Sequence, residues 1–284
     1  MRAYLLCLLI VVFPAAAHAV VVQQDMRPGI PASAEYLAGE RSKPAVLLLH
    51  GFLQTREFST VAMLAHGLHD AGYTVLSPTL SLNIPNRTQS LACEAVHKHS
   101  LDDDVAEIGH WIHWLKSRGH RSIVLAGHSF GSLQLLAYLS AKPDAAVKGC
   151  IGASLIEVQI GPDDRATLIA QLEDRVTNKQ RALFTHSLSF CRKYPSTPEG
   201  LLSYVRWDQA RVLAALKQSP VGVKLIMGDA DTSLDGGWLK ALQHAQTPMT
   251  VVKGANHFMD GTHEFDLLEH TLNDLKTIQQ SPSR

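Results

Sequence analysis

The pentapeptide Gly-His-Ser-Phe-Gly at residues 127–131 has the residue types and spacing of a nucleophile in a tight turn. A β-branched, apolar run at 123–126 precedes it, and leucines at helical spacing follow it. In such a strand-to-helix turn the hydroxyl of Ser129 stands clear of the sheet, at the positive end of a helix. Gly127 and Gly131 leave space where a side chain would collide with neighbouring backbone. We therefore predict that Ser129 is a nucleophile on a strained elbow.

A serine hydroxyl is a weak nucleophile at neutral pH and needs a general base, which a third group orients. His257 follows a predicted strand at 249–253, and Asp231 follows a predicted strand at 223–227. The carboxyl ends of parallel strands meet at one edge of a sheet, so these side chains are expected close together. The order serine, aspartate, histidine along the chain favours a triad of Ser129, Asp231 and His257.

Other residues are alternatives for the acid and the base. Asp229 lies on the same loop as Asp231, and Glu157 follows an earlier predicted strand. His263 is an alternative base, and the chain has 15 histidines, so residue type alone says little. The sequence thus leaves the acid open among Asp231, Asp229 and Glu157.

Acyl transfer also needs two N–H groups that stabilise the developing oxyanion. The amide of Phe130, directly after the serine, is one candidate donor. The other is the amide of Phe52, because His50-Gly51 permits a tight turn after a predicted strand at 45–49. We expect this oxyanion hole to lie beside Ser129.

Two clusters of metal-ligand residue types have simpler explanations. His97 and His99 have no third ligand nearby, so we interpret them as side chains of a solvated loop. Asp102–Asp104 begin a predicted helix, whose dipole stabilises carboxylates there, and their spacing does not match a calcium loop. We predict no metal site.

Strands alternate with helices from residue 45 onward, which predicts an α/β fold with a doubly wound, mostly parallel sheet. Residues 20–24 and 31–37 are expected to add an edge hairpin. Between about 157 and 217 short helical stretches replace this alternation, with no convincing strand. We interpret that segment as a helical insertion in a single domain spanning 20–284.

Residues 1–19 have the organisation of a signal peptide: a basic Arg2, an apolar run at 5–13 and a small-x-small site at Ala17-His18-Ala19. The apolar run is too short to span a bilayer, and no later segment is long and apolar enough to do so. We therefore expect an exported protein, periplasmic or secreted.

The cysteines after residue 19 allow one disulfide bond and one free thiol. In an oxidising compartment one pair of cysteines can form a disulfide, and we favour Cys93–Cys191, both in polar, loop-like surroundings. Cys150 lies in an apolar stretch and is expected to be a buried thiol.

The net charge of +0, without long blocks of either sign, argues against nucleic acid or a charged membrane surface as a partner.

The motifs His50-Gly51-Phe52, 127–131, Gly228–Asp231 and Gly254–His257 together resemble those of the α/β-hydrolase superfamily, from about Pro31 to Leu275. The resemblance implies an α/β-hydrolase fold, a Ser-His-Asp triad, an acyl-enzyme intermediate, and no metal or organic cofactor. The segment at 157–217 lies where many members carry a cap.

The function that follows is an exported serine hydrolase acting on an ester, in preference to an amide or thioester, of a small or medium acyl substrate. An acyltransferase with the same triad and a non-catalytic binding protein that kept the fold are the alternatives.

Overall fold

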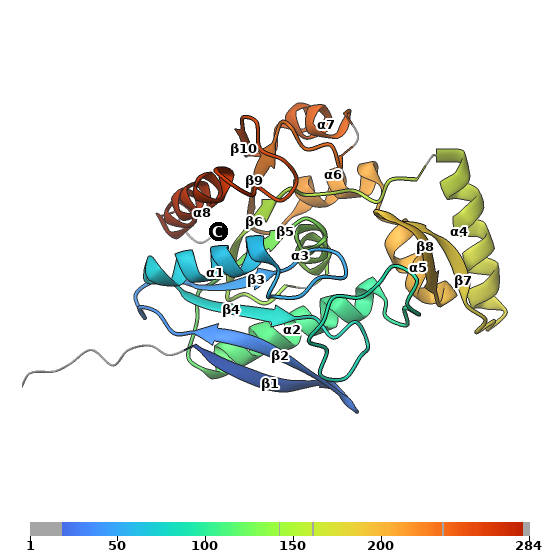
Figure 1. Ribbon diagram of the computed structural model, residues 1–284, viewed down its shortest axis with the longest axis horizontal. Helices are drawn as coiled ribbons and strands as arrows, with labels where there is room; N and C mark the ends of the chain where they lie inside the picture. Colours follow the sequence, from blue (N-terminus) through green and yellow to red (C-terminus); the bar gives the residue numbers. More distant parts are fainter. Residues whose placement is uncertain (1–18, 142, 161, 235, 281–284) are drawn as a thin grey trace, which may run out of the picture.

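The computed structural model describes residues 19–141, 143–160, 162–234 and 236–280 (Figure 1). The predicted signal peptide, except for Ala19, lies outside the described residues. Among the described residues, no helix combines the length and the apolar character needed to cross a membrane.

An 8-stranded sheet forms the centre of the molecule, with strand order β1-β2-β4-β3-β5-β6-β9-β10. β1 and β2 pair antiparallel, as do β2 and β4, and the remaining pairs are parallel. The predicted doubly wound, mostly parallel α/β sheet is therefore confirmed. Its strands are β1 (Val20–Arg27), β2 (Ile30–Leu37), β3 (Ala45–Leu49), β4 (Thr74–Thr79), β5 (Ile123–His128), β6 (Val147–Ala153), β9 (Gly222–Gly228) and β10 (Met249–Val252).

Helices cover both faces of the sheet and create two apolar cores (Figure 1). Along β3, Val46 and Leu48 pack with α1 and α8, whereas Leu47 and Leu49 pack with α2 and α3. This alternation explains why the strand reads as a continuous aliphatic run. The helices are α1 (Ser59–Asp70), α2 (Leu101–Ser117), α3 (Phe130–Ser140), α7 (Trp238–His244) and α8 (His263–Gln280).

The chain between β6 and β9 contains a β-hairpin as well as helices, so the prediction of a purely helical insertion is wrong. Its elements are α4 (Pro162–Thr177), β7 (Phe184–Leu188), β8 (Cys191–Ser196), α5 (Pro198–Val205) and α6 (Gln209–Gln218). β7 and β8 form a separate antiparallel pair. The pair has polar residues and Pro195 in its sequence, and proline is tolerated in strands that lack a second neighbour. We call β7, its turn and β8 the cap hairpin.

Cys93 and Cys191 form the predicted disulfide, with their Cα atoms 5.3 Å apart. The prediction of loop-like surroundings is wrong for Cys191, which is 1% exposed in β8. The bond therefore attaches the cap hairpin to the long loop after β4. Cys150 is a buried free thiol, as predicted, and burial raises its pKa to about 12.

His97 and His99 are buried, which corrects their interpretation as solvated loop residues. The ring of His97 stacks on Tyr194 of the cap hairpin at a centroid distance of 3.9 Å, and its Nε2 lies 3.2 Å from the carbonyl of Cys93. Within the described part of the chain, no group of three or more His, Cys, Asp or Glu side chains could hold a metal ion. The two histidines pack the cap hairpin against the long loop.

Carboxylates at the start of α2 have two different roles. Asp103 forms a capping box with Ser100, as expected for an acidic residue in a first turn. Asp104 is fully buried instead, and its Oδ2 accepts hydrogen bonds from Tyr204 Oη at 2.5 Å and Gln134 Nε2 at 2.7 Å. Burial raises the pKa of Asp104 to about 8. This carboxyl joins α2, α3 and α5 in its protonated form at neutral pH.

Asp104→Asn is expected to make the protein progressively more stable than the wild type as the pH rises from about 5 to 8. The raised folded-state pKa means that folded protein holds a proton that unfolded protein has lost, so wild-type stability declines with pH in this window. The variant, which mimics the protonated carboxyl, lacks this decline of up to about 1.4 kcal/mol per pH unit. Urea denaturation at several pH values measures the difference, and Asp102→Asn, exposed on the same helix, is the control. Curves for Asp104→Asn that stay parallel to the wild type would contradict the protonated state.

Candidate active site

Ser129 occupies the turn between β5 and α3 with φ 56° and ψ −121°, a strained conformation for a residue with a side chain. Its amide bonds to the carbonyl of Ala153 on β6 at 2.8 Å. A Cβ on Gly131 would lie 2.5 Å from the carbonyl oxygen of His50, and one on Gly127 would lie 2.8 Å from the backbone of Gly131. Only glycine fits at both positions, which lets β5, α3 and the loop after β3 pack closely around the serine.

The structure brings the predicted triad residues into one chain of hydrogen bonds. His257 Nε2 lies 2.7 Å from Ser129 Oγ, and His257 Nδ1 lies 2.6 Å from Asp231 Oδ2. A carboxylate only accepts, so Nδ1 carries the proton and Nε2 is free to accept from the serine hydroxyl. The side chains of His257 and Asp231 are 10% and 1% exposed. This arrangement allows proton transfer from Ser129 to the imidazole.

The alternative acid and base residues have other partners. Asp229 Oδ1 accepts a hydrogen bond from the amide of Gly254 at 2.5 Å. His263 Nδ1 lies 2.8 Å from Asp266 on α8. Glu157 lies in the loop after β6, and the carboxylate that bonds to His257 is that of Asp231. Among the candidates, the geometry therefore favours Asp231.

Two residues that sequence analysis did not single out hold the backbone of His257. His128 Nε2 and Ser154 Oγ both lie 2.8 Å from the carbonyl oxygen of His257, and both donate to it. Burial lowers the pKa of His128 to about 4, so its imidazole is neutral at physiological pH. His128 is the residue before Ser129, so the elbow positions the base as well as the nucleophile.

The loop after β3 lies against the serine and is held by the buried His50. A Cβ placed on Gly51 would come 3.4 Å from Ser129 Cβ. His50 Nδ1 donates to the carbonyl of Gly51 at 2.9 Å, and its Nε2 accepts from the amide of Leu80 at 3.1 Å. Burial lowers the pKa of His50 to about 3, so both bonds persist at neutral pH. His50 thus sets the plane of the peptide that carries the Phe52 N–H.

The two predicted oxyanion donors belong to neighbouring segments. The rings of Phe52 and Phe130 pack with centroids 4.6 Å apart. Among the described residues outside helices and strands, no backbone hydrogen bond uses the amide of Phe52 as a donor. Phe130 is the first residue of α3, where an amide has no acceptor within its own helix. Both N–H groups are therefore available to an oxygen atom near Ser129.

Two groups of aromatic side chains lie near the triad. Phe258 follows His257, contacts its ring edge-on at 5.3 Å, and packs on Phe58 at 5.4 Å. In the second group Phe190, in the turn of the cap hairpin, contacts Phe52 at 5.6 Å. No sequence pattern pointed to Phe190, because a hairpin was not predicted there.

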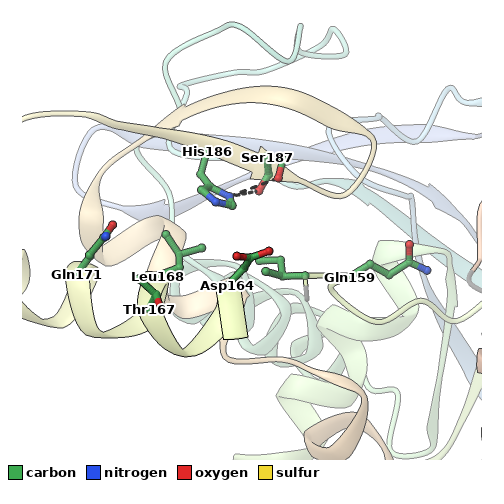
Figure 2. A pocket seen from close by; sticks show the side chains of 8 residues that line it. Gln159, Asp164, Thr167, Leu168, Gln171, His186 and Ser187 are labelled. Carbon is green, nitrogen blue, oxygen red and sulfur yellow. Dashed lines mark hydrogen bonds between the residues drawn. The ribbon is translucent and has the colours of Figure 1, made fainter. Parts of the chain in front are cut away.

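A polar cleft of about 580 Å³ lies between α4 and the cap hairpin (Figure 2). Figure 2 shows His186 and Ser187 of β7 facing Gln171, Thr167 and Asp164 of α4 across it. None of the triad residues lines this cleft. It belongs to the segment between β6 and β9, and we do not assign it to the chemistry at Ser129.

Comparison with known proteins decides the family. The profile described as "Alpha/beta hydrolase family" matches residues 46–267, which include every residue of the hydrogen-bonded triad. The chain belongs to the alpha/beta hydrolase family. A search of curated proteins finds no match.

Solved structures of other alpha/beta hydrolases share the fold at low sequence identity. The alpha/beta hydrolase GrgF from Penicillium sp. sh18 is 15% identical, with 93% of this chain and 100% of that chain covered and a TM-score of 0.69. Est1E from Butyrivibrio proteoclasticus with bound ferulic acid is 19% identical, with 90% and 99% covered and a TM-score of 0.62. A thioesterase domain from the curacin biosynthetic pathway is 18% identical, with 92% and 99% covered and a TM-score of 0.61.

Proposed function

We propose that this alpha/beta hydrolase is an exported serine hydrolase that cleaves carboxylic esters of small or medium acyl groups. The hydrogen-bonded chain from Ser129 through His257 to Asp231 is the observation that supports it most directly. A strained backbone at Ser129 and a buried imidazole and carboxylate beside it cost stability, and such features cluster at functional sites. They therefore favour an enzyme over a non-catalytic protein with the same fold. Family membership supports hydrolysis as the reaction class.

The proposed reaction passes through an acyl-enzyme. Ser129 Oγ attacks the ester carbonyl carbon while His257 Nε2 takes the hydroxyl proton. The imidazolium, stabilised by Asp231, gives this proton to the departing alkoxide, and the alcohol leaves. Water then attacks the acyl-enzyme carbonyl carbon while His257 Nε2 takes a proton from it. The bond from the acyl carbon to Ser129 Oγ breaks, His257 returns the proton to Oγ, and the carboxylic acid leaves.

The amides of Phe52 and Phe130 are the proposed donors to the tetrahedral oxyanion. Loss of one such donor typically costs on the order of 3 kcal/mol in the barrier. His50 would contribute by positioning, because its bond to the Gly51 carbonyl holds the Phe52 N–H in a fixed direction. Within the described residues, the amide of Phe52 has no protein backbone acceptor that it would have to give up in this role.

The site favours esters of acids with an apolar or aromatic group. Phe52, Phe130, Phe190 and Phe258 supply apolar surface around the triad. Est1E, a structural neighbour, has a structure with bound ferulic acid, an aromatic carboxylic acid, and another neighbour is a thioesterase. A Ser-His-Asp triad can cleave esters and thioesters alike, and we place esters first.

Export is part of the proposal. The signal-peptide pattern of residues 1–19 supports it, and so does the Cys93–Cys191 disulfide, because such bonds persist mainly in oxidising compartments. Expression with the native leader, fractionation and mass measurement of the N-terminus provide the test. Protein that stays in the cytoplasm with residues 1–19 attached would contradict export.

A fluorophosphonate probe and a panel of 4-nitrophenyl esters test the activity. We expect covalent labelling of one residue, Ser129, located by peptide mass spectrometry, and nitrophenol release that the same probe abolishes. Added alcohols separate hydrolysis from acyl transfer, since hydrolysis yields free acid whatever the alcohol. Absence of both labelling and turnover would favour a non-catalytic binding protein.

A further inference from the structure

The turn of the cap hairpin places an exposed phenylalanine in ring contact with Phe52 of the loop after β3 (residues 50–53), here called the oxyanion loop. Phe190 is 69% exposed, yet its ring makes an edge contact with Phe52, with planes at 86°. Phe52 packs on Phe130, the residue after Ser129. A large apolar side chain left in solvent so near a nucleophile is the kind of surface that a bound ligand covers.

The ring contacts divide the aromatic side chains near Ser129 into two groups. Phe258 contacts His257 and packs on Phe58. Phe190 contacts Phe52, and within the described residues no ring contact joins this pair to the group at His257. The base and the cap hairpin therefore each contribute a separate aromatic surface near the nucleophile.

The chemistry of acyl transfer distinguishes the two sides. In the tetrahedral intermediate the oxyanion faces the amide donors, and the leaving oxygen must reach His257 Nε2 to receive its proton. The remaining substituent, the acyl chain, then points away from His257. Of the two aromatic groups, the one that makes no ring contact with His257 contains Phe52 and Phe190.

We propose that Phe190 forms the outer wall of an apolar subsite for the acyl chain, and that the Cys93–Cys191 disulfide holds it over the oxyanion loop. This inference rests on the proposed ester hydrolysis and assigns its acyl specificity to the cap hairpin.

The disulfide adds a covalent attachment to a two-stranded hairpin, a unit that is only marginally stable alone. Cys191 directly follows Phe190, and its disulfide partner Cys93 lies in the loop after β4. The same loop donates a hydrogen bond from the amide of His97 to the carbonyl of Pro195 at 2.9 Å. Covalent and hydrogen-bonded attachments thus lie on β8, next to the turn that carries Phe190.

We expect Phe190→Ala to reduce kcat/KM for 4-nitrophenyl octanoate, relative to kcat/KM for 4-nitrophenyl acetate, about tenfold. The change should come mainly from a higher KM for the octanoate, because apolar contacts in a binding pocket discriminate between substrates on this scale. All esters in the series share one leaving group, so the change reports acyl binding. Phe265→Ala, at a phenylalanine 78% exposed on α8, is the matched control and should keep the wild-type ratio.

The disulfide is tested with Cys93→Ser/Cys191→Ser, for which we expect the same loss of octanoate preference. A second series with a constant acetyl group and varied alcohols should keep its wild-type order in Phe190→Ala. An unchanged octanoate-to-acetate ratio, or an effect on the alcohol series instead, would overturn the acyl subsite while fluorophosphonate labelling still supports the proposed function. Wild-type protein with neither labelling nor turnover would overturn the proposed function itself.

Discussion

Alanine at position 129 is expected to lower kcat for an ester substrate by about 10⁵- to 10⁶-fold and to abolish fluorophosphonate labelling. The hydroxyl is the proposed attacking group, and no other side chain hydrogen-bonds to His257 Nε2 among the described residues. Residual turnover above the uncatalysed rate should persist, because the amide donors and the binding surface remain. Steady-state kinetics and probe labelling measure the two effects.

The control for Ser129→Ala is Ser140→Ala, at the other end of α3. Among the described residues, Ser140 Oγ bonds only within its own helix, to the carbonyl of Leu136 at 2.9 Å, so its loss should leave kcat unchanged. Thermal unfolding of both variants shows whether the fold is intact. Activity of a folded Ser129→Ala protein within tenfold of the wild type would remove this serine from the mechanism.

Asp231→Asn is expected to lower kcat by about 10⁴-fold, whereas Asp229→Asn should lower it less than tenfold. Asparagine in place of Asp231 can donate to His257 Nδ1 and thereby favour the wrong tautomer, in which Nε2 carries the proton and cannot accept from Ser129. Asp229 bonds to the amide of Gly254 and does not touch the imidazole. Measuring kcat for the two isosteric variants shows which of the two carboxylates on this loop orients His257. A loss of kcat in Asp229→Asn, or in Glu157→Gln, that exceeds the loss in Asp231→Asn would reassign the acid.

The triad residues could be predicted from sequence because each depends on a local pattern. Glycines at 127 and 131, between a β-branched run and a leucine-rich helix, specify the elbow at Ser129. His257 and Asp231 each follow an apolar strand, and the geometry of parallel sheets brings such loops to one edge. Hydrophobic periodicity and turn chemistry act over a few residues, so the sequence alone determined the α/β class, the candidate nucleophile and the candidate base.

Tertiary structure decided what depends on contacts between distant residues. Asp229 and Asp231 share a loop, and only the packing against β10 and its following turn directs Asp229 to Gly254 and Asp231 to His257. The cap hairpin, with polar strands and a proline, is attached to the loop after β4 by a disulfide that spans 98 residues of sequence and by the ring of His97 stacked on Tyr194. Side-chain direction and strand pairing of this kind depend on contacts between residues far apart in the sequence. The free energy of such contacts cannot be inferred from the local sequence pattern.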